Sequence, residues 1–297
     1  MRSSLLVVVL ISGCAHARPP ADPDLRPGSL ESGGRTRTYL SWSPGKPGAP
    51  LVVALHGRMG TAVGMEQLSA LTAIAKREGF TVVFPDGVDK SWHDARDWGP
   101  AADQGVDDVA FLRALIDDFL AKGADPRRVF MLGMSNGGFM TLTFACRAAD
   151  KVTAVASITG GVSAPLAKDC PMSRPVPTAF FMGSDDRLVP FHGGKVANGR
   201  GETLSADASA RFFAAKNGCQ GEPVVEKLPD VAPDDGTRVE LRRWSGCRGN
   251  GHVELYVIEG GGHTWPGGWQ YAREFLIGKT SKDLSASEAA WRFFAAH

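Results

Sequence analysis

Short apolar runs and longer amphipathic stretches alternate along this chain, and each pattern predicts a different element. The runs 51–55 and 129–134 carry the large and β-branched side chains of strands that are buried on both faces. Apolar residues that recur every three or four positions, as in 109–119, predict helices. Strands alternating with helices predict an α/β fold, with a mostly parallel central sheet and helices on both faces.

The expected elements follow this alternation through the chain. Strands are expected at 35–42, 51–55, 80–84, 129–134, 152–158, 178–182, 238–244 and 252–258, and helices at 65–79, 107–123, from 138 onward, 207–216 and 285–297. Asp107 and Asp108 precede the second of these helices, where both carboxylates are expected to act as caps.

The run 129–134 stops at a serine flanked by glycines, and the other candidate groups are arranged around it. Gly133-Met134-Ser135-Asn136-Gly137 fits Gly-x-Ser-x-Gly, in which small residues let a strand and a helix pack closely around a strained turn. A chain with 36 glycines in 297 residues matches this pattern by chance about 0.3 times, so an ordinary tight turn is the alternative. The setting between strand and helix favours Ser135 as a nucleophile.

Further candidate loops follow buried strands, at the edge of an open α/β sheet where ligands bind. The loop after 51–55 runs His56-Gly57-Arg58-Met59-Gly60 and can turn backbone N–H groups toward a ligand. Its alternative is a simple turn with the histidine packed beneath it. The loop after 178–182 holds Asp185 and Asp186, and by position either carboxylate could orient a histidine.

The candidate general base is found by elimination among the seven histidines. Five of the seven are excluded as general base by their positions along the chain, and His93 and His263 remain. Of these two, His263 follows the last core strand in a glycine-rich loop. Ser135, an acid at 185 or 186, and then His263 give the chain order of α/β-hydrolase triads. An exposed bystander is the alternative for a histidine in such a loop.

The segment 88–105 lacks periodicity and carries several aromatic residues, and loops of this length are usually functional or disordered. Trp98 on this segment, and Trp265 two residues after His263, are expected to line the substrate pocket. The alternative for Trp98 is packing within its loop, and for Trp265 it is packing beneath the His263 loop.

Composition limits the expected partners. The chain is 43% hydrophobic and 22% charged, with a formal net charge of +1, and its length suits one sizeable core in a single domain. It has no long Lys/Arg run, so no nucleic-acid partner is expected. Its Cys and His spacings match no metal site. A small-molecule or oligomeric substrate is the expected partner, with no cofactor and no metal.

The N-terminus predicts an export signal, with Arg2 followed by an apolar core at 5–11 that is too short to span a membrane permanently. Ile11-Ser12-Gly13-Cys14 resembles a bacterial lipobox, in which Cys14 becomes the lipidated first residue. The alternative is ordinary cleavage after Ala15-His16-Ala17. The lipobox is favoured because all four positions match, which predicts a protein of the bacterial envelope, at the outer membrane or in the periplasm. The expected organisation is a signal peptide at 1–13, a proline-rich tether at 14–30 and a catalytic domain at 31–297.

Export also bears on the four remaining cysteines, Cys146, Cys170, Cys219 and Cys247. An even number in an oxidising compartment favours two disulfides over metal binding or free thiols. Three pairings are possible, and the simplest joins Cys146 to Cys170 and Cys219 to Cys247.

Four motifs occur in a fixed order: Leu55-His56-Gly57, residues 133–138, residues 183–194 and residues 261–268. Together they resemble the polyhydroxybutyrate depolymerase and feruloyl esterase family of secreted α/β-hydrolases, over a span from about Arg35 to the C-terminus. The resemblance implies an α/β-hydrolase fold. It also implies the two short-range disulfides.

The resemblance assigns roles to particular residues. It implies that Asp186, not Asp185, is the triad acid, and that the backbone N–H groups of Arg58 and Asn136 form an oxyanion hole. Two positions depart from the family pattern. Phe191 stands where tyrosine is common, and Arg58 stands where a small or apolar residue is usual.

The implied chemistry is hydrolysis of a carboxylic ester through an acyl-enzyme. His263 takes the proton of Ser135, Asp186 holds His263, and two backbone donors stabilise the oxyanion. Feruloyl or acetyl esters and hydroxyalkanoate oligomers are the candidate substrates. The alternatives are a serine peptidase of the same fold and a non-catalytic, lipid-anchored envelope binding protein.

Overall fold

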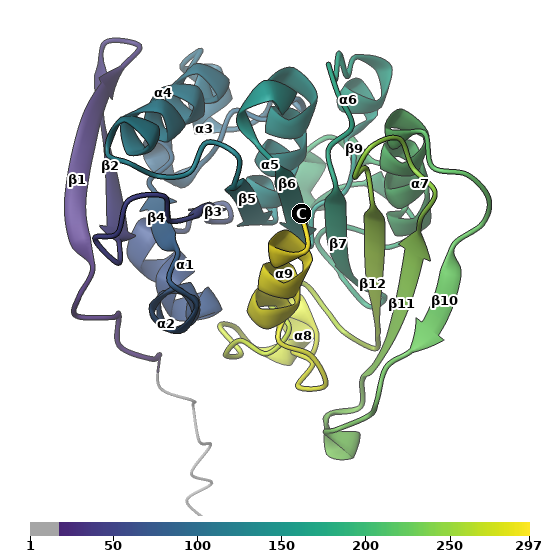
Figure 1. Cartoon of the computed structure of the whole chain (residues 1–297). Helices are drawn as coiled ribbons and strands as arrows, with labels where there is room; N and C mark the ends of the chain where they lie inside the picture. The colour runs from purple at the N-terminus through teal and green to yellow at the C-terminus, as the bar shows by residue number, and fades with distance from the viewer. Residues whose placement is uncertain (1–17) are drawn as a thin grey trace, which may run out of the picture.

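The computed structural model describes residues 18–297 (Figure 1). The strands are β1 (Arg26–Ser32), β2 (Arg35–Trp42), β3 (Leu51–Leu55), β4 (Thr81–Pro85), β5 (Val129–Met134), β6 (Ala154–Ile158), β7 (Thr178–Gly183), β8 (Gly194–Lys195), β9 (Glu202–Thr203), β10 (Val224–Lys227), β11 (Arg238–Trp244) and β12 (Val253–Glu259). The α-helices are α1 (Ala62–Ser69), α2 (Leu71–Glu78), α3 (Pro100–Asp103), α4 (Asp108–Ala121), α5 (Asn136–Arg147), α6 (Ala164–Lys168), α7 (Ala206–Asn217), α8 (Glu274–Ile277) and α9 (Ala286–Ala295). Short 3-10 helices are η1 (Val88–Lys90), η2 (Ala149–Lys151), η3 (Ala197–Gly199) and η4 (Pro233–Asp235).

One ten-stranded sheet runs through the described chain in the order β1-β2-β4-β3-β5-β6-β7-β12-β11-β10. Strands β4, β3, β5, β6, β7 and β12 are parallel to one another. At each edge of the sheet two further strands continue it in antiparallel register. The carboxyl ends of all six parallel strands therefore meet at one edge, where ligand sites of open α/β sheets are found.

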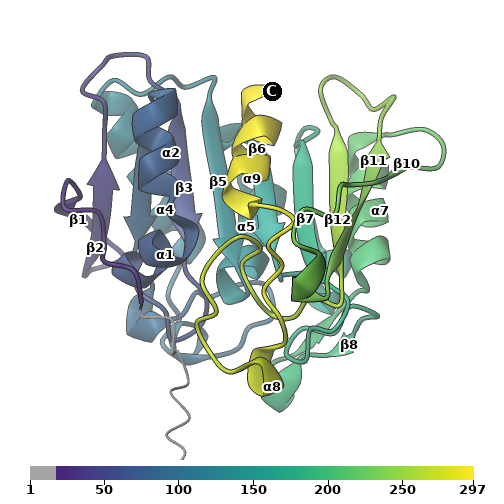
Figure 2. The same cartoon turned by 90° about the horizontal axis from the view of Figure 1, so that it is seen from below.

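Helices cover both faces of the sheet, as Figure 2 shows with α1, α2 and α9 in front. One apolar layer packs α4, α5 and α7 on the sheet, through side chains such as Phe111, Phe139 and Phe213. The second layer packs α1, α2 and α9 on the other face, with Phe293 and Phe294 among its members. Apolar runs without alternation form the central strands because both of their faces are buried.

Two disulfides close loops on the α5/α7 side of the molecule. Cys146 at the end of α5 pairs with Cys170, and Cys219 after α7 pairs with Cys247. This is the short-range pairing that the family resemblance implies.

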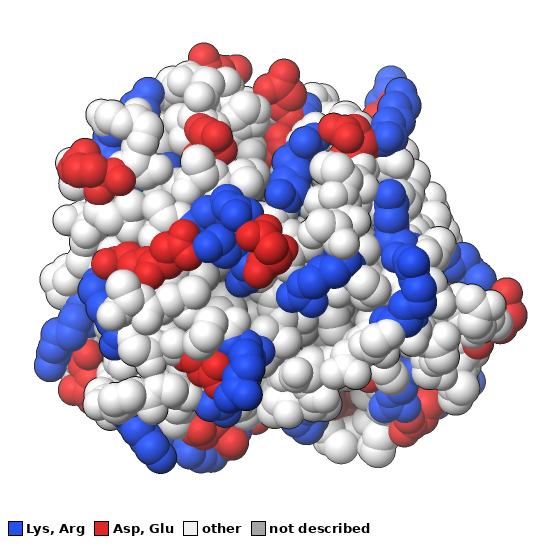
Figure 3. All heavy atoms as spheres, turned by 45° about the horizontal axis from the view of Figure 1, so that its top comes forward, with Lys and Arg blue, Asp and Glu red and all other residues white. Residues whose placement is uncertain are grey.

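Acidic and basic side chains are interspersed on the face shown in Figure 3. Among the helices of residues 18–297, none has both the length and the apolar character needed to cross a membrane.

The element expected at 65–79 differs in the structure, which has α1 and α2 with a break at Ala70, a residue in the left-handed region (φ 50°). The Ser69 hydroxyl donates back to the carbonyl of Met65, a bond that competes with helix continuation. The Ser69 carbonyl in turn accepts a hydrogen bond from Ser287 of α9 at 2.6 Å. A tertiary contact with a distant helix thus stabilises the break.

The segment expected to be a tether, 14–30, also differs over the residues that the structure describes. Asp22 and Asp24 both pair with Lys76 of α2, at 2.8 and 2.6 Å. Strand β1 then begins at Arg26 and pairs with β2 along its length. Its proline, Pro27, is tolerated because β1 is an edge strand. The folded domain therefore starts before residue 31.

Of the two carboxylates expected to cap α4, only Asp107 does so, accepting from the Ala110 amide at 2.8 Å. Asp108 is instead buried. It pairs with Arg37 of β2 at 2.7 Å and accepts from the His93 amide at 2.7 Å. This carboxylate therefore ties β2 and α4 to the segment 88–105, which borders the candidate site.

We expect Asp108→Ala to lower the free energy of unfolding by about 3–5 kcal/mol, because it leaves the buried Arg37 guanidinium without its counter-charge. The neighbouring substitution Asp107→Ala removes only a cap and should cost about 1 kcal/mol. Urea titration of both variants and wild type measures the difference. Equal losses in the two variants would contradict this account of the pair.

Candidate active site

Ser135 occupies the turn between β5 and α5 with a strained backbone, φ 55° and ψ −118°. Glycines on either side make this turn possible, because the chain packs too closely there for a side chain. A Cβ on Gly137 would lie 2.6 Å from the carbonyl oxygen of His56, and one on Gly138 would lie 2.6 Å from the Ser157 hydroxyl. The serine is thereby presented at the carboxyl edge of the sheet.

His263 follows β12 and Asp186 follows β7, and the two strands are neighbours in the sheet. Nδ1 of His263 lies 2.7 Å from Oδ2 of Asp186, and both side chains are almost fully buried. The other carboxylate oxygen of Asp186 accepts from the amides of Leu188 and Val189, each at 2.8 Å. The carboxylate is thus fixed by three donors, whereas Asp185 is exposed and accepts from the hydroxyl of its neighbour Ser184.

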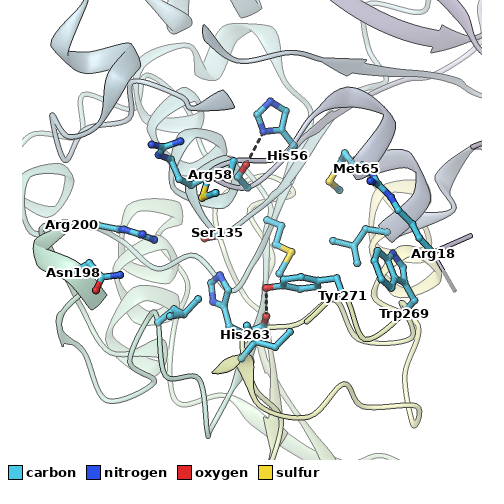
Figure 4. Close-up of a pocket in the computed structure, with 18 residues that line it drawn as sticks. Arg18, His56, Arg58, Met65, Ser135, Asn198, Arg200, His263, Trp269 and Tyr271 are labelled. Carbon is cyan, nitrogen blue, oxygen red and sulfur yellow. Dashed lines mark hydrogen bonds between the residues drawn. The ribbon is translucent and has the colours of Figure 1, made fainter. Parts of the chain in front are cut away.

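The carboxylate holds the imidazole of His263 so that its Nε2 side is directed toward Ser135 (Figure 4). Tyr271 supports the same loop by donating its hydroxyl to the His263 carbonyl at 2.7 Å. Burial raises the pKa of this hydroxyl well above its ordinary value, so it remains a donor.

Ser135 and His263 line one cavity of about 500 Å³. No hydrogen bond joins their side chains within the described chain, and such bonds commonly tighten only when substrate binds.

The loop after β3 approaches Ser135 from the neighbouring strand. Its His56 is buried, and Nε2 of the ring accepts from the Gly87 amide at 2.9 Å. Burial lowers the pKa of this imidazole, so the neutral form that accepts this bond is favoured. The indole of Trp92 donates to the His56 carbonyl at 2.8 Å. His56 therefore supports the loop from beneath, which was the alternative to a chemical role.

The backbone N–H groups of Arg58 and Asn136 are both available at this site. Within residues 18–297 neither amide donates to a protein acceptor, and Arg58 and Ser135 border the same cavity. The Asn136 side chain is turned away from the cavity, because it bonds to both main-chain groups of Trp92 and to Asp94. Only its backbone can face a substrate. The same bonds fix the segment 88–105 against the start of α5.

The expectation that Trp265 lines the pocket is wrong. Its side chain is buried in the core, and the indole donates to Ser287 of α9 at 3.0 Å. After β12 the chain runs along the face that α9 covers, so this side chain enters the apolar layer beneath the His263 loop.

Trp98 also stands outside the lining of the cavity. Its ring lies near two arginines that do line the cavity, with its centroid 5.2 Å from the Arg200 guanidinium carbon and 5.9 Å from that of Arg58. The aromatic side chains that do line the cavity are Trp269 and Tyr271, which were missed. They lie just beyond the glycine-rich motif around His263, and that proximity was the available signal.

Known proteins resemble this chain in sequence and in fold. Residues 38–170 match the family described as Esterase PHB depolymerase. The protein of Nocardia uniformis subsp. tsuyamanensis named "Putative esterase NocK" is 33% identical over 93% of this chain and 84% of its own length. Feruloyl esterase B of Piromyces equi is 31% identical over 80% of this chain, which spans 44% of that longer protein.

A solved structure shows the fold independently of these sequences. The acetyl xylan esterase from Aspergillus awamori superposes with a TM-score of 0.62, over 92% of this chain and all of that one, at 14% identity. With the mostly parallel sheet and its flanking helices, this match confirms the α/β-hydrolase fold expected from the motifs.

Proposed function

This chain is a carboxylic ester hydrolase that belongs to the Esterase PHB depolymerase family, and we propose that it acts through a triad of Ser135, His263 and Asp186. The observation that carries the proposal is the buried His263–Asp186 pair, 2.7 Å apart, beside a serine held in a strained turn. The three groups come from the ends of β5, β7 and β12, and the serine and histidine open into one cavity.

In the proposed first half-reaction, Ser135 Oγ attacks the ester carbonyl while Nε2 of His263 takes its proton. Asp186 keeps Nδ1 of His263 protonated and stabilises the imidazolium that forms, while the amides of Leu188 and Val189 hold its carboxylate group in position. The imidazolium then gives the proton to the departing alcohol oxygen as the ester C–O bond breaks. An acyl group remains on the serine.

The negative charge on the carbonyl oxygen is proposed to be stabilised by the N–H groups of Arg58 and Asn136. Asn136 is the first residue of α5, so its N–H belongs to the positive end of the helix dipole. These donors are fixed before substrate arrives and need no reorganisation during the reaction. Water, deprotonated by His263, then attacks the acyl-enzyme and releases the acid.

Feruloyl or acetyl esters and hydroxyalkanoate oligomers are the substrates we consider. Relatives named for feruloyl ester and poly(3-hydroxyalkanoate) hydrolysis support this range. Trp269 and Tyr271 offer flat surface for an aromatic acyl or alcohol group at the cavity wall. Cleavage of aminoacyl anilides faster than esters would favour a peptidase instead.

The two adjacent aspartates provide a matched test of the triad. Asp186→Asn should lower kcat for p-nitrophenyl acetate by about 10⁴-fold, because an amide at this position favours the wrong His263 tautomer. Asp185→Asn changes an exposed side chain and should leave kcat within about twofold. Steady-state kinetics on both folded variants checks this, and comparable losses would remove Asp186 from the proposed triad.

We also propose that the protein is exported and lipidated at Cys14, a position outside the described residues. Its two disulfides suit an oxidising compartment. Arg18 lines the cavity, so an anchor four residues earlier would keep the cavity within roughly 14 Å of the lipid attachment.

We expect the wild-type protein expressed in bacteria to partition into detergent and to carry a lipid mass on its first peptide. Cys14→Ala should be recovered in the aqueous phase, because it lacks the acylated thiol. Mass spectrometry of the N-terminal peptide decides the point. An unmodified wild-type N-terminus at residue 16 or 18 would show that the lipobox match is accidental.

A further inference from the structure

The two sides of the cavity differ in chemistry. Arg58 and Arg200 lie on the same side of Ser135, and Trp269 and Tyr271 lie across from them (Figure 4). Arg18, next to Trp269, also lines the cavity, but no Asp or Glu side chain does so within the described chain. The site thus offers cations to a substrate without an acidic neighbour to neutralise them.

Within residues 18–297, the guanidiniums of Arg58 and Arg200 make no hydrogen bond and no ion pair. The Nε atoms of both are buried and make no hydrogen bond. The nearby Arg96 differs, because it pairs with the buried Asp94 at 2.6 Å. Burying an unbonded donor is costly unless a ligand supplies the acceptor. The two guanidiniums that border the cavity therefore have unused donors.

The guanidiniums of Arg58 and Arg200 are also close enough for their positive charges to repel each other. Burial, together with the positive charges of Arg58 and Arg96, lowers the pKa of Arg200. The ring of Trp98 lies against both guanidiniums, which offsets part of this cost through its negative face but accepts no strong hydrogen bond. An anion between the arginines would relieve the repulsion and could accept hydrogen bonds from the Nη groups of both side chains.

A buried polar network sets the position of Arg200. The Asn136 amide donates to Asp94 at 2.8 Å, and Asp94 pairs with Arg96. Arg96 in turn donates to the Arg200 carbonyl at 3.2 Å. The backbone that carries Arg200 is thus tied to the residue that follows the nucleophile, which gives this arginine a defined place relative to the reacting carbonyl.

We propose that Arg58 and Arg200 bind a carboxylate carried by the substrate, so that the enzyme prefers esters with a free acid group. The inference rests on the proposed ester hydrolysis at Ser135. The two Nη groups of a planar guanidinium lie side by side and match the two oxygens of a carboxylate, and in both arginines they are not buried as the Nε atoms are. Half-esters of dicarboxylic acids and esters of hydroxy acids combine the scissile bond with such a group, and Trp269 and Tyr271 face the remaining part.

Paired substrates test this preference on either side of the scissile bond. For the acyl side we compare p-nitrophenyl half-esters of glutaric and adipic acid with the same compounds methylated at the free carboxyl. For the alcohol side we compare 4-acetoxybenzoate with its methyl ester. In at least one pair kcat/KM for the anionic member should exceed that for the neutral one by about ten- to a hundredfold. The preference should shrink in 0.5 M NaCl.

Arg200→Gln should lower kcat/KM for the preferred anionic ester at least ten times more than for its neutral partner. Arg58→Gln should act in the same direction, which covers the case in which one variant fails to fold. Arg35→Gln is the control for net charge, because Arg35 is exposed at the start of β2 and does not line the cavity. The ratio between the two esters should stay at its wild-type value in this control.

Binding to Ser135→Ala separates this inference from the proposed function. Calorimetry should detect the anionic ester on Ser135→Ala and a loss of at least tenfold in affinity when Arg200→Gln is added. Neutral esters cleaved as fast as anionic ones, with binding insensitive to Arg200, would overturn the inference and leave ester hydrolysis standing. Binding of the anion without cleavage of any ester would instead contradict the proposed function.

Discussion

Helix α5 begins in direct contact with the backbone at the end of β3, and this close approach is the constraint on which the rest of the site depends. A Cβ on Gly137 would lie 2.6 Å from the carbonyl oxygen of His56, so the helix can start there only with glycine. Only one residue, Ser135, separates the end of β5 from the start of α5. The chain turns at this residue, whose φ is 55°. The same contact brings the N–H at the start of α5 beside the loop that carries Arg58.

The order of the parallel strands brings together residues that this local contact cannot reach. Ser135, Asp186 and His263 are far apart in sequence, but they follow β5, β7 and β12, whose carboxyl ends lie at one edge of the sheet. Buried hydrogen bonds then hold Asp186, His263 and the neighbouring backbone in place. They include the two backbone donors to Asp186 and the network that starts at Asn136 and reaches Arg200. A rigid scaffold thus fixes both the candidate nucleophile and the neighbouring cations.

The features that sequence could predict are those that local patterns determine. The glycine spacing around Ser135 predicts the tight turn, and apolar runs predict the strands whose ends carry Asp186 and His263. The direction of a side chain within a loop has no such pattern, because nearness to the His263 motif holds for Trp265 and Trp269 alike. Trp265 enters the core and Trp269 lines the cavity because α9 covers one side of their loop. The break at Ala70 likewise depends on Ser287, in a distant helix. Whether Arg200 finds a hydrogen-bond acceptor also depends on elements distant in the chain.

Covalent labelling of the serine tests the central claim most directly. A fluorophosphonate should add one phosphonyl group to the folded protein, and peptide mass mapping should place it on Ser135, because the strained turn and His263 activate that hydroxyl. The His263→Ala variant, folded but lacking the base, should react far more slowly. Rapid labelling at another residue, or equal rates with and without His263, would contradict the account.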